Sequence, residues 1–308
     1  MIDKIDRKIL SNICIDANIS NLRLAKSIGL NTATVTKRID AMVKKDLITI
    51  KAVRNLFRLG YKVRAFITLN VDLLSIDQLK AKLIESPNVH FAVTTFGRYD
   101  VLVLVDFPDW EKLNSFMRED VNQWPGVRQS NIFLVAEIKK IQRNIFPDHS
   151  NSNPPVILDD ANNKIIQELS KNGLTSYTEL ASRLGVNPAT ISRRVGSLID
   201  SGTIKILAIP NPPKFGYSAC AYIMLGTDRA RVDTICTELN KYPQIRLSMT
   251  LTNGFNIIAY VQFLNPELLY EFIKRAISPI PGITTIETLI VAESINMTYA
   301  SIDLDNLP

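Results

Sequence analysis

The chain is poor in the residues that most often carry catalysis, metal binding or disulfide stabilisation. Its 308 residues include three cysteines, Cys14, Cys220 and Cys236, and two histidines, His90 and His149. The cysteine spacings match no metal-binding motif, so we interpret all three as reduced core residues. Two histidines leave little room for acid–base chemistry. We therefore expect no metal site, no cofactor, no catalytic residue and no enzyme activity.

The chain also lacks the apolar segments that carry a protein into or across a membrane. Its longest apolar runs, such as residues 101–105, have the length of a strand rather than of a membrane span. Residues 1–6 are too polar for the core of a secretory signal. An apolar fraction of 46% and a charged fraction of 21% are typical of a soluble globular protein. We expect a cytoplasmic protein with no membrane partner.

What the chain has instead is a repeat of itself. Residues 3–141 align with residues 159–297 at a constant offset of 156, without insertion or deletion. Identical pairs occur along the whole repeat, among them Leu24 and Leu180, Gly29 and Gly185, Arg38 and Arg194, Gly60 and Gly216, and Glu137 and Glu293. A period of this length indicates duplicated domains rather than a solenoid. Positions that differ between the copies can therefore separate their roles.

The net charge of +6 is unevenly distributed between the copies. Residues 1–52 contain ten Lys and Arg against five Asp and Glu, whereas the equivalent residues 158–209 contain six against five. A basic excess in one small domain favours a polyanionic partner.

Each copy starts with a helical pattern and continues with a mixed one. In the first copy, apolar spacing and capping residues predict helices at about 3–14, 20–29 and 31–45, followed by a short strand at 48–51. The remainder predicts the order β-α-β-β-α-β, with elements at 64–71, 75–85, 89–95, 99–106, 109–121 and 127–138. That order is typical of a ferredoxin-like sandwich, so the predicted class is α+β.

The same pattern in both copies predicts five segments. They are a helix-turn-helix domain at 1–52, a ferredoxin-like domain at 60–145, a polar, Pro-rich linker at 146–157, a second helix-turn-helix domain at 158–209 and a second ferredoxin-like domain at 215–300.

Two helices joined by a tight glycine turn have the layout of a helix-turn-helix, whose second helix enters the DNA major groove. The residues predicted to contact DNA are small polar or basic side chains of that helix: Thr32, Thr34, Thr36, Lys37, Arg38, Lys44 and Lys45, and in the second copy Asn187, Thr190, Ser192, Arg193 and Arg194. Among them, Arg38, Arg194, Lys44 and Lys45 suit backbone phosphates best. A solvated helix face would contain similar residues, but the whole arrangement occurs twice.

Each copy resembles a complete subunit of the Lrp/AsnC (feast/famine) transcription regulators. The resemblance rests on the opening residues 3–10, residues 24–30, residues 35–39, the loop Phe96-Gly97-Arg98-Tyr99-Asp100 and Pro125-Gly126-Val127. It implies a winged helix-turn-helix joined by a strand to a ferredoxin-like ligand-binding domain. It also implies that two ligand-binding domains pack sheet to sheet and present two DNA-reading heads.

In this family a small effector, often an amino acid, binds near the loop, so the resemblance implies an effector site at Gly97, Arg98, Tyr99 and Asp100. Asp100 would then pair with an ammonium group; the alternative is that it serves only the backbone of its own loop. The second copy has Asn253, Phe255 and Asn256 in place of Gly97, Tyr99 and Asp100. We expect that copy not to bind an amino acid in the same way.

These observations predict a sequence-specific transcription regulator in which one chain acts as a pseudo-dimer. Double-stranded DNA is the expected partner, an amino acid the expected effector, and a dimer or tetramer of chains the expected assembly. Two alternatives stay open. One is a tetrapyrrole enzyme similar to siroheme decarboxylases, with His90, Arg98, Tyr99 and Arg246 as the residues to examine. The other is an effector-binding scaffold that no longer binds DNA.

Overall fold

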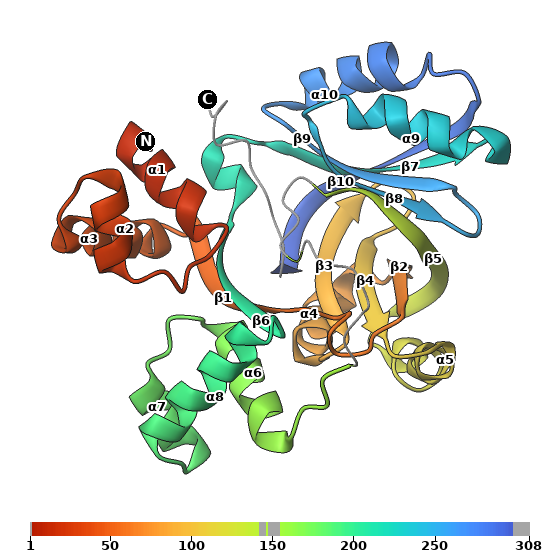
Figure 1. Ribbon diagram of the computed structural model, residues 1–308. Helices are drawn as coiled ribbons and strands as arrows, with labels where there is room; N and C mark the ends of the chain where they lie inside the picture. Colours follow the sequence, from red (N-terminus) through yellow and green to blue (C-terminus); the bar gives the residue numbers. More distant parts are fainter. Residues whose placement is uncertain (1, 142–145, 147–154, 298–308) are drawn as a thin grey trace. The chain divides into compact units, whose positions relative to one another are not determined.

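The chain folds as two compact units, and each repeat contributes to both. The computed structural model describes residues 2–141, 146 and 155–297 (Figure 1). The described parts of Met1–Gly60 and Arg143–Phe215 form one unit, and Tyr61–Gln142 with Gly216–Met297 form the other. The predicted linker at 146–157 lies mostly outside the described residues. The described elements follow the predicted ones closely, within a few residues at their ends.

The first unit contains two winged-helix domains of three helices each. They are α1 (Lys4–Ile13), α2 (Asn21–Ile28), α3 (Thr32–Lys44), α6 (Asp160–Lys171), α7 (Tyr177–Leu184) and α8 (Pro188–Asp200). Ser20 and Asn31 cap α2 and α3 by accepting backbone hydrogen bonds. Between these helices Gly29 adopts a φ of 73°, the left-handed conformation that a non-glycine residue adopts at a cost.

A strand from each winged-helix domain joins the two domains. The strands β1 (Ile48–Arg54) and β6 (Ile204–Pro210) form an antiparallel two-stranded sheet along their whole length. In each domain, the loop between the first and second helices is also hydrogen-bonded to the strand of the other domain. Ala17 N–H donates to the Ile206 carbonyl at 2.7 Å, and the repeat-equivalent Gly173 N–H donates to the Ile50 carbonyl at 2.8 Å. The two domains therefore share backbone hydrogen bonds in both directions.

The second unit consists of two βαββαβ halves. The first has β2 (Val63–Val71), α4 (Ile76–Glu85), β3 (Val89–Phe96), β4 (Val101–Phe107), α5 (Trp110–Glu119) and β5 (Val127–Ile141). The second has β7 (Ala219–Thr227), α9 (Val232–Asn240), β8 (Ile245–Leu251), β9 (Ile257–Phe263), α10 (Pro266–Phe272) and β10 (Ile283–Met297).

The last strand of each half connects the two sheets. β5 pairs with β2 from Val127 to Leu134 and then with β8 from Val135 to Ile141. β10 does the same with β7 and β3. The result is a closed barrel with the order β10-β3-β4-β2-β5-β8-β9-β7. The sequence predicts the strands but not this exchange, which makes the two halves one body rather than two separate sandwiches.

The barrel has an apolar core under the helices of each half and a third core inside. Alternate β2 residues face the two sides, so Ala65 and Ile67 pack with helix residues while Phe66 points into the barrel. There, Phe66 lies 6.1 Å from Phe91 between ring centroids, and Phe91 stacks on Tyr222 of the other half at 5.4 Å. Aromatic packing inside the barrel thus joins residues from both repeats.

Among the described residues, no helix is long and apolar enough to cross a membrane.

The shared interior predicts that the two halves unfold together. Phe66→Ala should lower the free energy of unfolding by about 3–5 kcal/mol, the usual cost of removing a buried aromatic ring. Hydrogen exchange should then quicken in β7 and β9 of the second half as well as in β2 and β4. Ile84→Ala is the control, because that side chain on α4 is 58% exposed. Faster exchange confined to the first half would contradict a single cooperative barrel.

Candidate nucleic-acid interface and effector loop

At the start of helix α3, two polar side chains are held by hydrogen bonds within the domain, and a third is exposed. The Asn31 side chain accepts from Thr34 N–H at 2.8 Å and so sets the start of the helix. The Thr36 hydroxyl donates to the Thr32 carbonyl at 3.0 Å and accepts from the Asn21 amide of α2 at 2.8 Å. Lys37 is exposed. Thr36 therefore helps to fix the angle between α2 and α3, while Lys37 is available to a partner.

Arg38 ties α3 to the beginning of α1. Its Nη1 donates to Asp3 at 2.6 Å and to Asp6 at 2.7 Å. The backbone N–H of Asp6 and then Arg38 lower the pKa of the Asp3 carboxyl, because both stabilise its ionised form. The sequence pattern predicts Arg38 as a phosphate contact, but it does not reveal these two carboxylates as partners. They give Arg38 a role in positioning α3.

The second head repeats this tie with its own residues. Arg194 Nη1 donates to Asp159 at 2.7 Å and to the Asn162 side chain at 3.0 Å. Asn187 caps α8 by accepting from Ala189 N–H, and Thr190 lies half-buried in the first turn. Ser192 and Arg193 are exposed. The two heads therefore share a scaffold, and their exposed residues differ around it.

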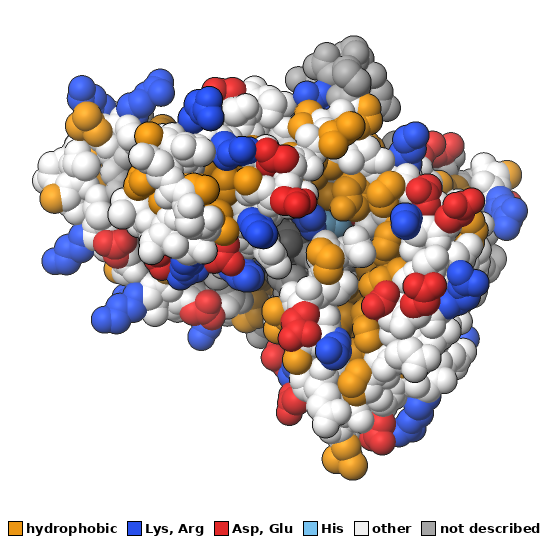
Figure 2. Space-filling view, turned by 90° about the horizontal axis from the view of Figure 1, so that it is seen from below, with side chains coloured by type: hydrophobic (Ala, Val, Ile, Leu, Met, Phe, Trp, Pro, Cys, Tyr) orange, Lys and Arg blue, Asp and Glu red, His pale blue; other side chains and the backbone are white. Residues whose placement is uncertain are grey.

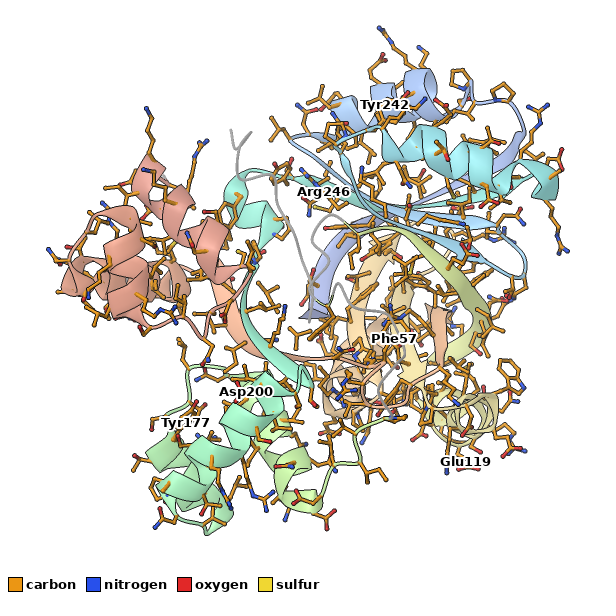
Figure 3. The ribbon with its side chains drawn as sticks, viewed as in Figure 1. Phe57, Glu119, Tyr177, Asp200, Tyr242 and Arg246 are labelled. Carbon is orange, nitrogen blue, oxygen red and sulfur yellow. The ribbon has the colours of Figure 1, made fainter. Side chains whose placement is uncertain are left out.

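The exposed charges favour the first head as the stronger binder of a polyanion. Lys44 and Lys45 are exposed at the end of α3, whereas the equivalent positions at the end of α8 are Asp200, labelled in Figure 3, and Ser201. Arg183 on α7 is neutralised by Glu168 at 2.5 Å and Glu179 at 2.6 Å. Figure 2 shows Lys and Arg side chains in blue and Asp and Glu side chains in red on one face of the surface.

Two of the residues in the predicted effector loop are held by the fold itself. The Asp100 carboxylate accepts from Val71 N–H at 2.8 Å, and in the second half the Asn256 side chain accepts from Thr227 N–H at the same distance. Tyr99 is 6% exposed, and its ring packs on Phe133. Phe255 of the second half is buried too, and its ring packs on the same phenylalanine. The fold needs one acceptor oxygen and one buried ring at these positions, and both repeats supply them.

The other two residues of the loop, Gly97 and Arg98, lie at its exposed surface. Gly97 has a φ of 142°, and a Cβ atom there would come within 2.8 Å of the Thr288 carbonyl oxygen of β10. This close approach and conformation require glycine. Arg98 is exposed, with its guanidinium carbon 5.6 Å from the centre of the Tyr99 ring.

The equivalent loop of the second half is bonded to strand β5 of the first half. The Asn253 amide, at the position of Gly97, donates to the Ile132 carbonyl at 2.7 Å, and its oxygen accepts from Leu134 N–H at 3.2 Å. This side chain covers the edge of β5 where the first half has a bare glycine. The two loops therefore differ in whether a side chain at this position bonds to the neighbouring strand.

A buried polar cluster occurs at the opposite end of the barrel strands. Asp106 accepts from Arg64 at 2.8 Å and lies 3.4 Å from His90 Nε2. The repeat-equivalent positions are Cys220, Arg246 and Gln262, and all three are buried. Figure 3 labels Arg246 at the start of β8. The sequence shows that the two copies have different polar residues at these positions, but it does not show that the residues of each set are buried.

The cysteines offer no metal site in the described structure. Cys14, Cys220 and Cys236 are all free and buried. Burial raises the pKa of Cys236 to about 11, so its thiol is protonated at neutral pH. Within residues 2–141 and 155–297, no group of three or more His, Cys, Asp or Glu side chains is arranged to hold a metal ion.

Comparison with known proteins agrees with this geometry in both repeats. A winged helix-turn-helix DNA-binding model matches residues 2–49 and 158–205. An Lrp/AsnC ligand-binding domain model matches residues 64–145 and 220–301, more than half of the chain. The chain belongs to the Lrp/AsnC family.

Two relatives show how the repeats correspond to single family members. An uncharacterized HTH-type transcriptional regulator from Pyrococcus horikoshii is 31% identical over 148 residues, which is 48% of this chain and 94% of the relative. The HTH-type transcriptional regulator FL11 from Pyrococcus furiosus is 31% identical over 136 residues, 44% of this chain and 89% of the relative. This Lrp/AsnC protein is therefore a tandem duplication of a transcription regulator, with DNA-binding and ligand-binding domains in each copy.

The similarity to a solved structure can extend along nearly the whole chain. The siroheme decarboxylase NirDL is such a structure, with a TM-score of 0.59, 16% identity and coverage of 96% of this chain and 94% of that one. At this identity the likeness shows the fold alone. It establishes that the duplicated arrangement occurs in another protein.

The loop contacts predict a difference between two substitutions of Asp100. Asp100→Asn should leave the free energy of unfolding within about 0.5 kcal/mol of the unmodified protein, because Asn256 makes the same bond without a charge. Asp100→Ala should cost about 1–2 kcal/mol, because Val71 N–H is left without its acceptor. Urea denaturation measures both. Equal losses of stability from the two substitutions would show that the charge, and not the acceptor, stabilises the loop.

Proposed function

We propose that one chain of this regulator does the work of a family dimer on DNA. The observation that carries the proposal is the β1–β6 sheet, which fixes the two winged-helix domains as a pair within one chain. In a dimer of separate subunits such a pairing depends on concentration. Here it is intramolecular, so both heads are presented to DNA at any concentration of the protein.

The two heads read unequal half-sites in this proposal. Helices α3 and α8 enter the major groove, where Thr32, Thr34, Lys37, Thr190, Ser192 and Arg193 face bases and phosphates. Lys44 and Lys45 add charged phosphate contacts, whereas Asp200 and Ser201 at the equivalent positions bring no positive charge. Phosphate contact by Arg38 and Arg194 stays a prediction. The ion pairs of these arginines with Asp3 and Asp159 support a second role, in which they position α3 and α8. An asymmetric operator follows, with stronger non-specific affinity under the first head.

The effector site belongs to the first half alone. The loop with Gly97, Arg98 and Asp100 is accessible at its surface, whereas Asn253 closes the loop of the second half by bonding to β5. We propose an amino acid as the effector, with Asp100 pairing to its ammonium group while keeping the bond to Val71 N–H. One effector per chain follows. The protein acts in the cytoplasm, in keeping with DNA as its partner.

A tetrapyrrole enzyme is the second candidate, and the buried cluster around His90 is the observation that favours it. The ion pair of Arg64 with Asp106, beside His90, supports an internal structural role for that cluster instead. Absorbance during titration with siroheme or haem separates the candidates. Tight stoichiometric binding would favour the enzyme, and an unchanged spectrum would favour the regulator.

The regulator proposal predicts a salt dependence that differs between the heads. Lys44→Gln/Lys45→Gln should weaken DNA binding and reduce the slope of log K against log salt by about 1 for each phosphate that is no longer neutralised by a lysine. The matched variant in the second head, Asp200→Lys/Ser201→Lys, should steepen the slope. Fluorescence anisotropy with labelled duplex over a salt series measures both. Unchanged slopes in both variants would remove these positions from the interface.

The effector proposal predicts a loss of response without a loss of fold. Asp100→Asn should abolish amino-acid-dependent changes in DNA affinity, because the amide cannot neutralise an ammonium group. Binding of DNA without effector should be unchanged. Asn256→Asp is the control in the second half and should leave the response as it was. A full response in Asp100→Asn would exclude Asp100 as the ammonium partner.

A further inference from the structure

The exposed face of helix α3 has a carboxylate between two lysines. Lys37, Asp40 and Lys44 follow one another at intervals of three and four residues, so they lie on one face of the helix, and all three are exposed. The opposite face is buried in the core of the domain through Val35, Ile39 and Met42. Asp40 therefore lies on the face of α3 that is open to a partner.

The fold makes no visible use of the Asp40 carboxylate. Asp3 and Asp6 of the same domain both bind Arg38. Within residues 2–141 and 155–297, by contrast, no ion pair involves Asp40, although a lysine is one turn away on each side. Asp40 also lies in the second half of α3, where the helix dipole does not favour an acidic residue. Stability of the domain thus gives no reason for a carboxylate at this position.

The second head has a glycine, Gly196, at the equivalent position of α8. A Cβ atom added to Gly196 would have no other atom within 4 Å, and Gly196 is not among the glycines with a positive φ. Neither space nor backbone conformation requires glycine there, and glycine destabilises the interior of a helix relative to alanine. The fold leaves this position free, and the two heads differ at it by a side chain and a charge.

The chemistry of the major groove restricts what a carboxylate on this face can bind. Phosphates repel it, and so do the acceptor atoms that guanine and thymine present in the groove. Adenine presents its N6 amino group beside the acceptor N7, whereas the edge of cytosine presents the N4 amino group without an acceptor. Cytosine is therefore the base that suits a single carboxylate best.

We infer that Asp40 selects a cytosine in the half-site under the first head, and that the equivalent base pair under the second head is not selected. Gly196 has no side chain that could read it. Lys37 and Lys44 lessen the repulsion between the Asp40 carboxylate and the DNA phosphates. This role rests on the proposed function and deepens it, because it names one base and the residue that reads it. The half-sites would then differ in specificity as well as in phosphate affinity.

The repeat supplies matched variants for the test. Asp40→Gly gives the first head the residue of the second, and Gly196→Asp makes the reverse exchange in open space. Asp40→Ala also removes the carboxylate but keeps a strong helix former. Asp40→Asn replaces the carboxylate with an amide, which pairs with adenine N6 and N7. Asp16→Asn is the control, because Asp16 is exposed in the same domain but lies outside α3.

Selection from a library of random duplexes identifies the half-sites, and fluorescence anisotropy with each of the four base pairs at each position measures the preferences. The unmodified protein should prefer cytosine by about 10-fold at one position of one half-site. Asp40→Gly and Asp40→Ala should lose that preference and keep the others. Asp40→Asn should change it to adenine, and Gly196→Asp should add a cytosine preference to the other half-site. Asp16→Asn should leave every preference as it was.

Two results would overturn the inference while the proposed regulator stands. One is that Asp40→Ala selects the same half-sites as the unmodified protein, with the same preference at each position. The other is that Asp40→Asn keeps the preference for cytosine. If the unmodified protein selects no duplex at all, the proposed regulator fails, and the reading role of Asp40 fails with it.

Discussion

Each repeat leaves backbone groups that only the other repeat can satisfy, and the architecture depends on this constraint. β5 starts in the sheet of its own half and ends in the sheet of the other, and β10 does the same from the second half. The strands β1 and β6 have each other as sheet partner. Buried N–H and C=O groups without partners are costly, so neither repeat can fold alone with its edges intact. Covalent linkage of the copies therefore supplies the second subunit that a single repeat would have to find in solution.

This constraint explains which positions remained alike and which diverged. The position of Asp100 and Asn256 must provide one acceptor oxygen, and the position of Tyr99 and Phe255 must provide a buried ring. Neither requirement fixes a charge or a hydroxyl. The surface positions are freer still, since Lys44 and its equivalent Asp200 both end a helix without affecting its core. Divergence thus accumulated in exposed groups that the fold does not constrain, while the shared barrel and the shared sheet kept their packing.

The sequence alone predicts most of the elements because their signals are local. Caps such as Ser20 and Asn31, the left-handed Gly29 and the alternation of apolar residues in the strands each act within a few residues. Strand exchange was not predictable in this way, because a long strand has the same alternating pattern whichever neighbours it pairs with. The candidate sites were predicted in part for the same reason. Helical spacing places Arg38 on the reading helix, but only the three-dimensional structure shows that Asp3 and Asp6 bind it.

In the proposed function, one chain supplies both heads of a paired DNA reader. The most direct measurement is the mass of the complex formed on a duplex with two half-sites, at protein concentrations too low for chains to pair. We expect one chain for each duplex, with an affinity that falls by about 100-fold or more when either half-site is scrambled, because the second contact is intramolecular. Two chains on each duplex, each occupying one half-site, or an affinity unchanged by scrambling would contradict it.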